Sequence, residues 1–263
     1  MKSIEVYSLG AILCLLLIGG EVHSSEPDQT VKKHLFSQQQ SKYPRYRKAV
    51  IEVRQALDAL YEQAGLDGRP IEVLIRAFKQ EEKLELWGRG DENDTLKLIK
   101  TYDFTSFSGR LGPKWKQGDR QIPEGIYYID RFNPASSYHL SLGLNYPNQA
   151  DLKRTDASDP GGDIFIHGNA VTIGCIPIGD RSIEELYVAC VDARDSGQDK
   201  IPVHIYPCRM TKVNQPIFGR ISQDHPKIKK LYDQLQTIYD AFRSSHQMPK
   251  IEISRSGEYI LES

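Results

Sequence analysis

Residues 164–175 of the 263-residue chain read Ile-Phe-Ile-His-Gly-Asn-Ala-Val-Thr-Ile-Gly-Cys. The apolar run at 164–166 predicts a short strand that leads into His167, and Cys175 follows eight positions later, across one short turn. A histidine this close can remove the proton of the thiol, and the thiolate is the nucleophilic form of cysteine. The stretch therefore predicts a cysteine nucleophile that carries out acyl transfer.

A glycine adjoins each of the two candidate catalytic residues, His167 and Cys175. Gly174 removes side-chain bulk before Cys175, so that a backbone N–H can approach a developing oxyanion, and Gly168 clears space beside His167. A helix that opens a few residues after Cys175 is expected to favour the thiolate through its N-terminal dipole. No acidic residue is placed to orient His167, so a backbone carbonyl is the expected partner. A buried structural cysteine beside a hydrogen-bonded histidine is the alternative that spacing alone leaves open.

Two further histidines lie in predicted strands. His139 follows Tyr138 and is expected to face the same cleft as His167, and the alternative is a partly exposed strand histidine. His204 lies in the apolar strand 201–206, where a hydrogen-bonded core residue is expected.

The other cysteines leave their pairing open. Cys14 is expected to leave with an export signal, and Cys175, Cys190 and Cys208 remain. An odd count in an exported protein allows one disulfide, Cys190–Cys208, and one free thiol, but two buried thiols fit equally well. A zinc site that adds His204 to these cysteines lacks any compact ligand pair, so we predict no metal.

The N-terminus resembles an export signal. Lys2 gives a positive start, the apolar run at 9–18 is shorter than the roughly 18 residues of a membrane span, and small residues near Ser24 suit cleavage. We therefore expect a signal peptide at 1–24 and no membrane span after its removal, with an uncleaved anchor as the alternative.

Composition indicates an ordinary globular chain. Hydrophobic residues make up 39% and charged residues 26%, and the net charge is −1. This balance gives no case for nucleic-acid binding. The basic stretch from Lys32 to Arg54 is expected to be a solvated helix face, with contact to an anionic polymer or membrane surface as the alternative.

The hydrophobic pattern alternates between strand and helix periods. It predicts helices at 45–64 and 226–242 and another after Cys175, with Ser182 and Glu185 as a capping box. Predicted strands are 71–75, 84–87, 96–104, 126–129, 138–142, 164–166 and 201–206, followed by a terminal hairpin at 251–261. Residues 25–43 are expected to be a loose lead-in, 79–83 a polar tip, and 109–125 and 145–162 surface loops. Strands dominate the middle, so we predict an α+β fold, mostly β, with an N-terminal helix and a C-terminal helix plus hairpin.

The combination of motifs resembles the catalytic domain of YkuD-type L,D-transpeptidases, and within that family the YafK-like subgroup. The resemblance rests on a strand followed by His-Gly, a turn, and the segment Thr172-Ile-Gly-Cys175 before a helix. Supporting segments are Gly118-Asp-Arg-Gln-Ile-Pro-Glu-Gly125, Tyr138-His-Leu-Ser-Leu-Gly-Leu-Asn-Tyr-Pro-Asn148 and Ile205-Tyr-Pro-Cys-Arg-Met210. The resemblance runs from about residue 69 to the end of the chain.

The resemblance implies a cell-wall enzyme without a cofactor, exported to the periplasm or cell wall. Cys175 would attack a carbonyl of a peptidoglycan stem peptide and form a thioester. His167 would transfer the proton, and backbone near Gly174 and Gly168 would support the oxyanion, with His139 and Thr172 as candidate substrate contacts. The expected parts are a signal peptide (1–24), a lead-in and helix (25–68), a catalytic domain (69–207) and a C-terminal extension (208–263).

Two departures from the family leave the outcome of the reaction open. Many members carry Arg two residues after the nucleophile, where this chain has Pro177, and the loop between His-Gly and Cys is short. The alternatives are a hydrolase of the same family that releases a lipoprotein linked to peptidoglycan, and a non-catalytic wall-binding module. A toxin that uses the same chemistry on a rival's wall is less consistent with an ordinary export signal.

Overall fold

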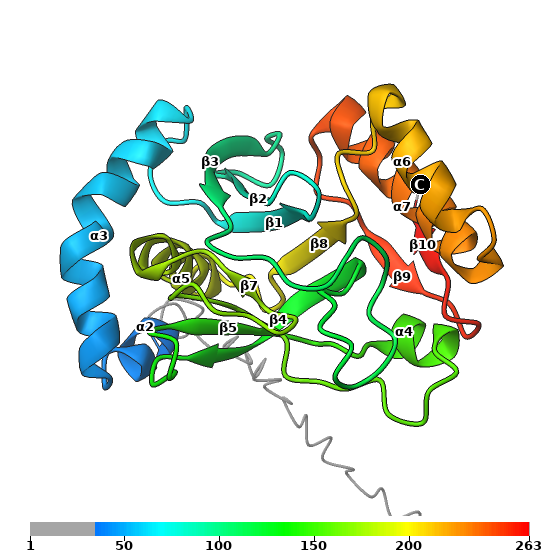
Figure 1. The fold of residues 1–263 in the computed structure, drawn as a ribbon. Helices are drawn as coiled ribbons and strands as arrows, with labels where there is room; N and C mark the ends of the chain where they lie inside the picture. The colour runs from blue at the N-terminus through cyan, green and yellow to red at the C-terminus, as the bar shows by residue number, and fades with distance from the viewer. Residues whose placement is uncertain (1–34, 263) are drawn as a thin grey trace, which may run out of the picture.

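An eight-stranded sheet runs through the middle of the molecule (Figure 1). The computed structural model describes residues 35–262, so the predicted export segment 1–24 and the first part of the lead-in lie outside the described residues. The strands are β1 (Glu72–Phe78), β2 (Lys83–Arg89), β3 (Lys97–Asp103), β4 (Gly125–Asn133), β5 (Ser141–Leu144), β6 (Phe165–His167), β7 (Ile176–Pro177) and β8 (Pro202–Tyr206). Their order across the sheet is β3-β2-β1-β8-β4-β5-β6-β7.

Strand β8 joins the two halves of this sheet. It pairs parallel with β1 and antiparallel with β4, although it comes last of the eight in sequence. The only other parallel pair in the sheet is β6–β7, which aligns Ile166 with Ile176 and His167 with Pro177. The loop between these two strands contains the turn that ends at Cys175, so the register of β6 and β7 fixes both ends of that turn.

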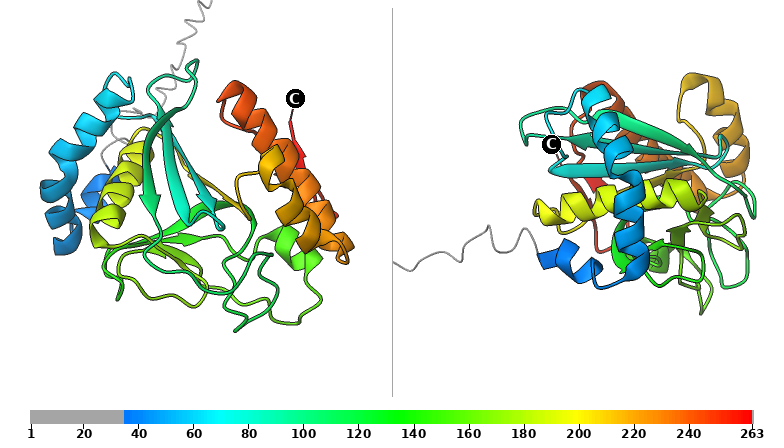
Figure 2. Two further views of the ribbon diagram at one scale, coloured as in Figure 1. Left: turned by 45° about the horizontal axis from the view of Figure 1, so that its top comes forward. Right: turned by 90° about the vertical axis from the view of Figure 1, so that its left-hand side faces the viewer.

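Three helices cover one side of the sheet: α2 (Leu35–Gln40), α3 (Pro44–Gln63) and α5 (Asp180–Asp195). Helix α3 lies on the outside, and α5 lies between it and the strands (Figures 1 and 2). Helix α3 buries one stripe, spaced by three and four residues: Tyr46, Ala49, Val53, Leu57 and Tyr61. That spacing places these side chains on a single helical face against α5, as amphipathic packing requires.

The C-terminal extension lies on the opposite side (Figures 1 and 2). It consists of the 3₁₀ turn η1 (Lys212–Asn214), α6 (Gln215–Ser222), α7 (Pro226–Ser245) and the hairpin β9 (Ile251–Ile253) and β10 (Tyr259–Leu261). The apolar face of α7 packs with Phe78 and Tyr206 from the ends of β1 and β8 in a second hydrophobic cluster. Within residues 35–262, no helix combines the length and apolar character needed to cross a membrane.

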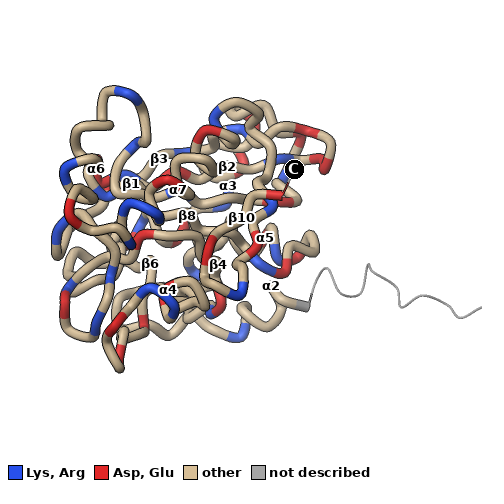
Figure 3. The backbone as a smooth tube through the Cα atoms, turned by 90° about the vertical axis from the view of Figure 1, so that its right-hand side faces the viewer, with Lys and Arg blue, Asp and Glu red and all other residues tan. Residues whose placement is uncertain are grey.

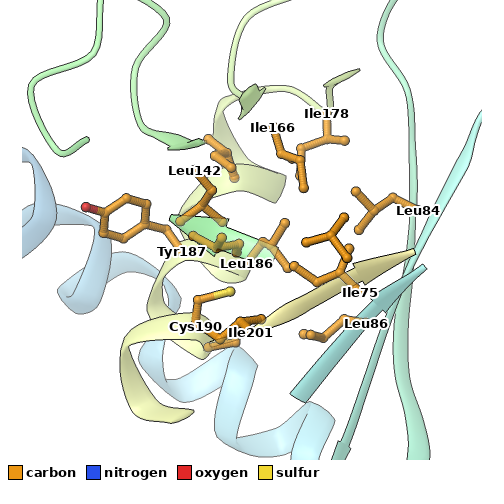
Figure 4. Packing of buried hydrophobic residues seen from close by; sticks show 14 of the residues in the cluster. Ile75, Leu84, Leu86, Leu142, Ile166, Ile178, Leu186, Tyr187, Cys190 and Ile201 are labelled. Carbon is orange, nitrogen blue, oxygen red and sulfur yellow. The ribbon is translucent and has the colours of Figure 1, made fainter. Parts of the chain in front are cut away.

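The main core lies between α5 and the strands (Figure 4). Side chains from β1, β2, β5 and β6, among them Ile75, Leu84 and Ile166, point toward Leu186 and Cys190 of α5 (Figure 4). Each large apolar side chain buried here contributes about 1.5–3 kcal/mol relative to exposure. This packing holds β6, and therefore the residues that follow it, rigidly against α5.

The α+β prediction and the long helices are confirmed. Helix α3 matches the predicted 45–64, α7 matches 226–242 with three more residues at its end, and β9–β10 form the terminal hairpin. The predicted capping box of α5 is wrong, because the helix begins at Asp180 with Gly179 as N-cap, so Ser182 lies inside the first turn. Gly179 has a φ of 79°, a backbone conformation that glycine adopts without steric cost.

Three further expectations are corrected. The lead-in contains α2, and the predicted loop 145–162 contains the short helix α4 (Gln149–Arg154). Asn148 caps α4 by accepting from the backbone N–H groups of Ala150 and Asp151. Lys79, assigned to a polar tip, is fully buried because its ammonium pairs with the carboxylate of Glu124 at 2.9 Å.

Candidate active site

His167 is the last residue of β6 and is held by both neighbouring strands. It pairs with Ser141 on antiparallel β5 and with Pro177 on parallel β7. Its carbonyl accepts from the N–H of Ile178 at 2.9 Å. Only 1% of the residue is exposed, so its ring is fixed by the sheet rather than by a mobile loop.

The carbonyl of Gly168 orients the imidazole of His167. The distance from His167 Nδ1 to Gly168 O is 2.5 Å. Because a carbonyl only accepts, we assign the ring proton to Nδ1, which leaves Nε2 with a free lone pair. The ring of Tyr138 packs against the imidazole of His167 at an angle of 33°, with centroids 4.7 Å apart. The expectation that a backbone carbonyl would take this place is confirmed.

Cys175 lies directly before β7, and its side chain is only partly accessible. The thiol donates to the carbonyl of Asp163, with Sγ and O 3.7 Å apart. Burial raises the pKa of Cys175. A hydrogen bond from the backbone of Phe165 and the charge of Lys114 act in the opposite direction, but the net shift of the pKa is upward. The predicted help from the dipole of the following helix therefore does not produce a resting thiolate.

Burial also lowers the pKa of His167, although the bond to the Gly168 carbonyl acts in the opposite sense. Both shifts favour the uncharged form, since charge is costly where water is excluded. At neutral pH the resting pair is therefore a neutral imidazole and a neutral thiol. Such a pair suits general-base catalysis, in which the proton moves as the sulfur attacks.

The turn before Cys175 is closed by Thr172. Its hydroxyl donates to the carbonyl of Cys175 at 2.8 Å and accepts from the N–H of Gly174 at 3.1 Å. Gly174 has a φ of 135°, and a Cβ there would lie 3.0 Å from the carbonyl oxygen of Gln121. Glycine is required at this position by both conformation and space. Substrate contact by Thr172 and oxyanion support by Gly174 stay predictions.

Gly168 is required for clearance. A Cβ there would lie 2.5 Å from Oδ1 of Asp180 and 2.9 Å from the backbone oxygen of Tyr138. Its N–H is shared between the carbonyls of Tyr138 and Leu140, at 3.1 and 3.2 Å. The N–H of Gly168 is thus directed into the protein, and its support of the histidine comes from its carbonyl.

His139 lies in the turn before β5, so its assignment to a strand is wrong. Its φ is 71°, a left-handed conformation that is uncommon for residues other than glycine. Its Nε2 lies 2.7 Å from a carboxylate oxygen of Glu184 in the first turns of α5. The carbonyl of His139 accepts from Arg45 of α3. His139 therefore ties the turn to both helices, and its contact with substrate stays a prediction.

Tyr138 and Lys114 are site residues that sequence analysis missed. Tyr138 adjoins the histidine that the sequence singled out, and it is this neighbour that packs against His167. Lys114 lies in a segment interpreted only as a loop, yet it is buried and pairs with Asp119 at 2.7 Å. The only sequence feature that could have indicated a role for Lys114 is the Lys-Trp-Lys pattern at 114–116, which directly follows Gly112-Pro113.

Cys190 and Cys208 are free thiols, and both are buried. Cys190 packs in the core on α5 (Figure 4), and Cys208 follows β8. Burial raises the pKa of Cys208 to about 12 and that of Cys190 further, so neither forms a thiolate readily. The structure therefore supports two buried thiols and not a Cys190–Cys208 disulfide. Across residues 35–262, no three His, Cys, Asp or Glu side chains gather to hold a metal.

The chain is similar to known proteins. Residues 74–205 match the sequence profile of YkuD, the L,D-transpeptidase catalytic domain. The chain is 32% identical over 191 residues to the Escherichia coli (strain K12) protein named "Putative L,D-transpeptidase YafK", covering 72% of this chain and 73% of that protein. The protein of that name in Escherichia coli O157:H7 gives the same identity and coverage.

Solved structures with similar coordinates include the helical cell shape determining protein Pgp2 of Campylobacter jejuni. It has a TM-score of 0.41 and 17% identity, covering 74% of this chain and 80% of that one. Bdellovibrio bacteriovorus Bd1075 has a TM-score of 0.38 and 19% identity, covering 68% of this chain and 76% of that one. Given the profile match over half of the sequence and the 32% identity over most of it, the chain belongs to the YkuD family of L,D-transpeptidase catalytic domains.

Proposed function

We propose that the chain is a cysteine acyltransferase that acts on peptidoglycan stem peptides. The observation that carries this proposal is the anchored histidine. The Gly168 carbonyl holds Nδ1 of His167, so Nε2 is the free base, and Cys175 directly precedes β7, the strand that pairs in parallel with β6. Nucleophilic catalysis by cysteine requires a base with a defined tautomer within reach of the thiol, and we propose that Nε2 of His167 is that base.

The reaction follows from the resting protonation states. Sγ of Cys175 attacks the carbonyl carbon of an amide bond while Nε2 of His167 takes the thiol proton. The carbon–nitrogen bond then breaks, the proton passes from His167 to the leaving amine, and a thioester remains. Transfer of the acyl group to an amine completes transpeptidation, and transfer to water completes hydrolysis. The neutral pair avoids the cost of a buried charge until the substrate arrives.

Membership of the family supports the choice of substrate. We infer a donor stem peptide in which Cys175 attacks the carbonyl at the L-centre of a diamino acid and releases the terminal D-alanine. The predicted export segment supports action outside the cytoplasm, in the periplasm or at the cell wall. A hydrolase that releases a wall-linked lipoprotein would use the same two residues, Cys175 and His167, in the same roles.

Mass analysis of defined muropeptides after incubation with the enzyme separates these reactions. Cross-linked dimers indicate transfer, whereas shortened stems or released lipoprotein indicate hydrolysis. We expect a carbapenem to form a covalent adduct at Cys175 that Cys175→Ala lacks. A folded wild-type protein that forms no adduct and leaves every muropeptide unchanged would indicate the non-catalytic wall-binding module instead.

A further inference from the structure

A cavity of about 470 Å³ lies between the 110–121 loop and the C-terminal helices. Arg110, Trp115 and Lys116 line it from the loop, and Ile221, His225 and Ile228 line it from α6, α7 and the residues between them. The cavity therefore exists only because the C-terminal extension packs against the catalytic sheet. Neither the acyl-transfer chemistry nor the positioning of His167 uses any of these side chains.

The wall between loop and helix is held by a buried ionic cluster. The ammonium of Lys79 donates to the carbonyls of Gly112 and Ile122, at 2.7 and 2.8 Å, and pairs with Glu124. The same carboxylate accepts from the N–H of Gly112 and from the hydroxyl of Tyr232 on α7, both at 2.8 Å. Because these groups are buried and mutually bonded, the cavity is preformed and a ligand need not order it.

The charge available inside the cavity is positive. Its one acidic lining residue, Asp119, is occupied by Lys114 and by the backbone N–H groups of Trp115, Lys116 and Gln121. By contrast, no side-chain hydrogen bond or ion pair of Arg110 or Lys116 occurs among residues 35–262. Acidic and basic residues are otherwise interspersed along this side of the molecule (Figure 3). Two unpaired cations beside apolar walls complement a ligand that is part anion and part hydrocarbon.

The loop connects the cavity to the nucleophile. Gln121 lines the cavity, and its carbonyl is the atom that a Cβ on Gly174 would meet at 3.0 Å. The charge of Lys114, which lies in the same loop, acts on the thiol of Cys175. Gln121 therefore lies between the cavity and the turn that ends at Cys175.

We propose that this cavity binds the carboxylate-bearing part of the peptide substrate, with Arg110 and Lys116 as its anion contacts and Trp115 and Ile228 as its apolar walls. This inference rests on the proposed function, because it assigns the recognition of a peptide to the extension and its cleavage to Cys175. Arg110 and Lys116 act here as specificity-determining residues and take no part in the chemical step.

The test compares two double variants on one pair of peptides. Arg110→Ala/Lys116→Ala removes both cations, and Lys97→Ala/Arg243→Ala removes the same charge from exposed positions on β3 and α7. The substrates are a synthetic stem peptide with free carboxylates and the same peptide with those groups amidated, and release of the leaving amine is measured. We expect the first variant to raise KM for the carboxylate peptide roughly tenfold, with kcat unchanged, and to lose discrimination against the amide. The control variant should keep both properties.

Each failure has a different readout. Acylation of Cys175 by a carbapenem reports the nucleophile without use of the cavity, and it should be equal in all three proteins. If the wild type is acylated and cleaves the peptide, but the Arg110→Ala/Lys116→Ala variant keeps its KM and its discrimination, the cavity proposal is wrong and the proposed function stands. If the wild type is neither acylated nor active, the proposed function itself falls. Thermal unfolding shows that both variants are folded.

Discussion

Two regions of the sheet each bury a histidine to 99%, and they use it differently. His204 lies inside β8, where Arg76 and Tyr206 surround it, and His167 lies at the free end of β6. Burial and the charge of Arg76 lower the pKa of His204 to about 3, so it stays neutral throughout the physiological range. Burial alone therefore does not make a histidine reactive. His167 differs in its position, because it is the last residue of β6 and the turn that follows it leads to Cys175.

The surroundings of His204 and His167 also differ in what holds each ring in place. The guanidinium of Arg76 is enclosed by four aromatic rings, with Phe242 nearest at 4.4 Å, which joins β1 and β8 to α7. Around His167 the backbone is unusual instead, with positive φ at His139, Asn169 and Gly174. Strained conformations of this kind persist where neighbouring structure enforces them, and they gather at functional sites. The region around His204 and Arg76 therefore joins the sheet to α7, and we call it the cohesive region. The region around His167 holds that ring in a defined position.

The largest effect expected from this contrast is on activity. His167→Gln removes the base, so turnover of a muropeptide should fall by roughly 10² to 10⁴, and loss of this buried, hydrogen-bonded ring should also lower stability by about 1–3 kcal/mol. His204→Gln is the matched control, because that ring is equally buried but lies inside β8, where the proposed mechanism gives it no role. It should lower stability by about 1–3 kcal/mol and leave turnover per folded molecule intact. Equal losses of activity in the two variants would remove the distinction between the regions.

The cohesive region should respond to loss of its buried ion pair. Lys79→Met leaves the carboxylate of Glu124 buried without its cation, and breaking such a pair costs about 3–5 kcal/mol of unfolding free energy. Lys83→Met is the control, since that lysine pairs with Asp103 at an exposed position, where such pairs are worth under about 1 kcal/mol. Urea unfolding measures both. Similar midpoints for the two variants would show that the Lys79 cluster does not hold the extension.

A smaller effect is expected from one added methyl group beside His167. Gly168→Ala places a Cβ against Asp180 and the backbone of Tyr138, which should cost about 1–3 kcal/mol and shift the histidine. Gly162→Ala is the control, because nothing lies within 4 Å of its Cβ and its φ is not in the left-handed region. Turnover and thermal unfolding together report the outcome. An active Gly168→Ala enzyme of normal stability would contradict the requirement for clearance.

Sequence patterns predicted the features that depend on local period. The stripe that became α3 repeats every three or four residues over twenty positions, and the motif around Cys175 and His167 lies within twelve residues. Helix α4 has six residues, too few to show a stripe, although Asn148 and Asp151 carried a capping pattern at its start. In so short a helix only the cap leaves a sequence signal, and the segment was therefore predicted to be a loop.

Features that depend on distant partners could not be predicted in this way. Lys79 looked like part of a polar turn, because its partner Glu124 lies 45 positions away in the sequence and Tyr232 much further. Tyr138 contacts His167 because the turn before β5 lies beside the end of β6, and no local sequence pattern reveals this contact. The thiol pKa of Cys175 was expected to fall because the following helix was considered and burial was not.

The smallest expected effect concerns the resting protonation states of Cys175 and His167. It would appear as shifts in the pH dependence of Cys175 alkylation and of turnover. Burial raises the pKa of Cys175, so its alkylation by iodoacetamide should be slow at neutral pH and increase only above the ordinary thiol value of about 8.5. Because burial lowers the pKa of His167, the base should stay deprotonated as the pH falls, and the acid limb of turnover should lie below about 6.5. Mass analysis of the peptide that contains Cys175 separates its alkylation from that of Cys190 and Cys208. An alkylation profile that is already complete at neutral pH would reveal a thiolate–imidazolium pair, and the proton would then move before the substrate binds rather than during attack.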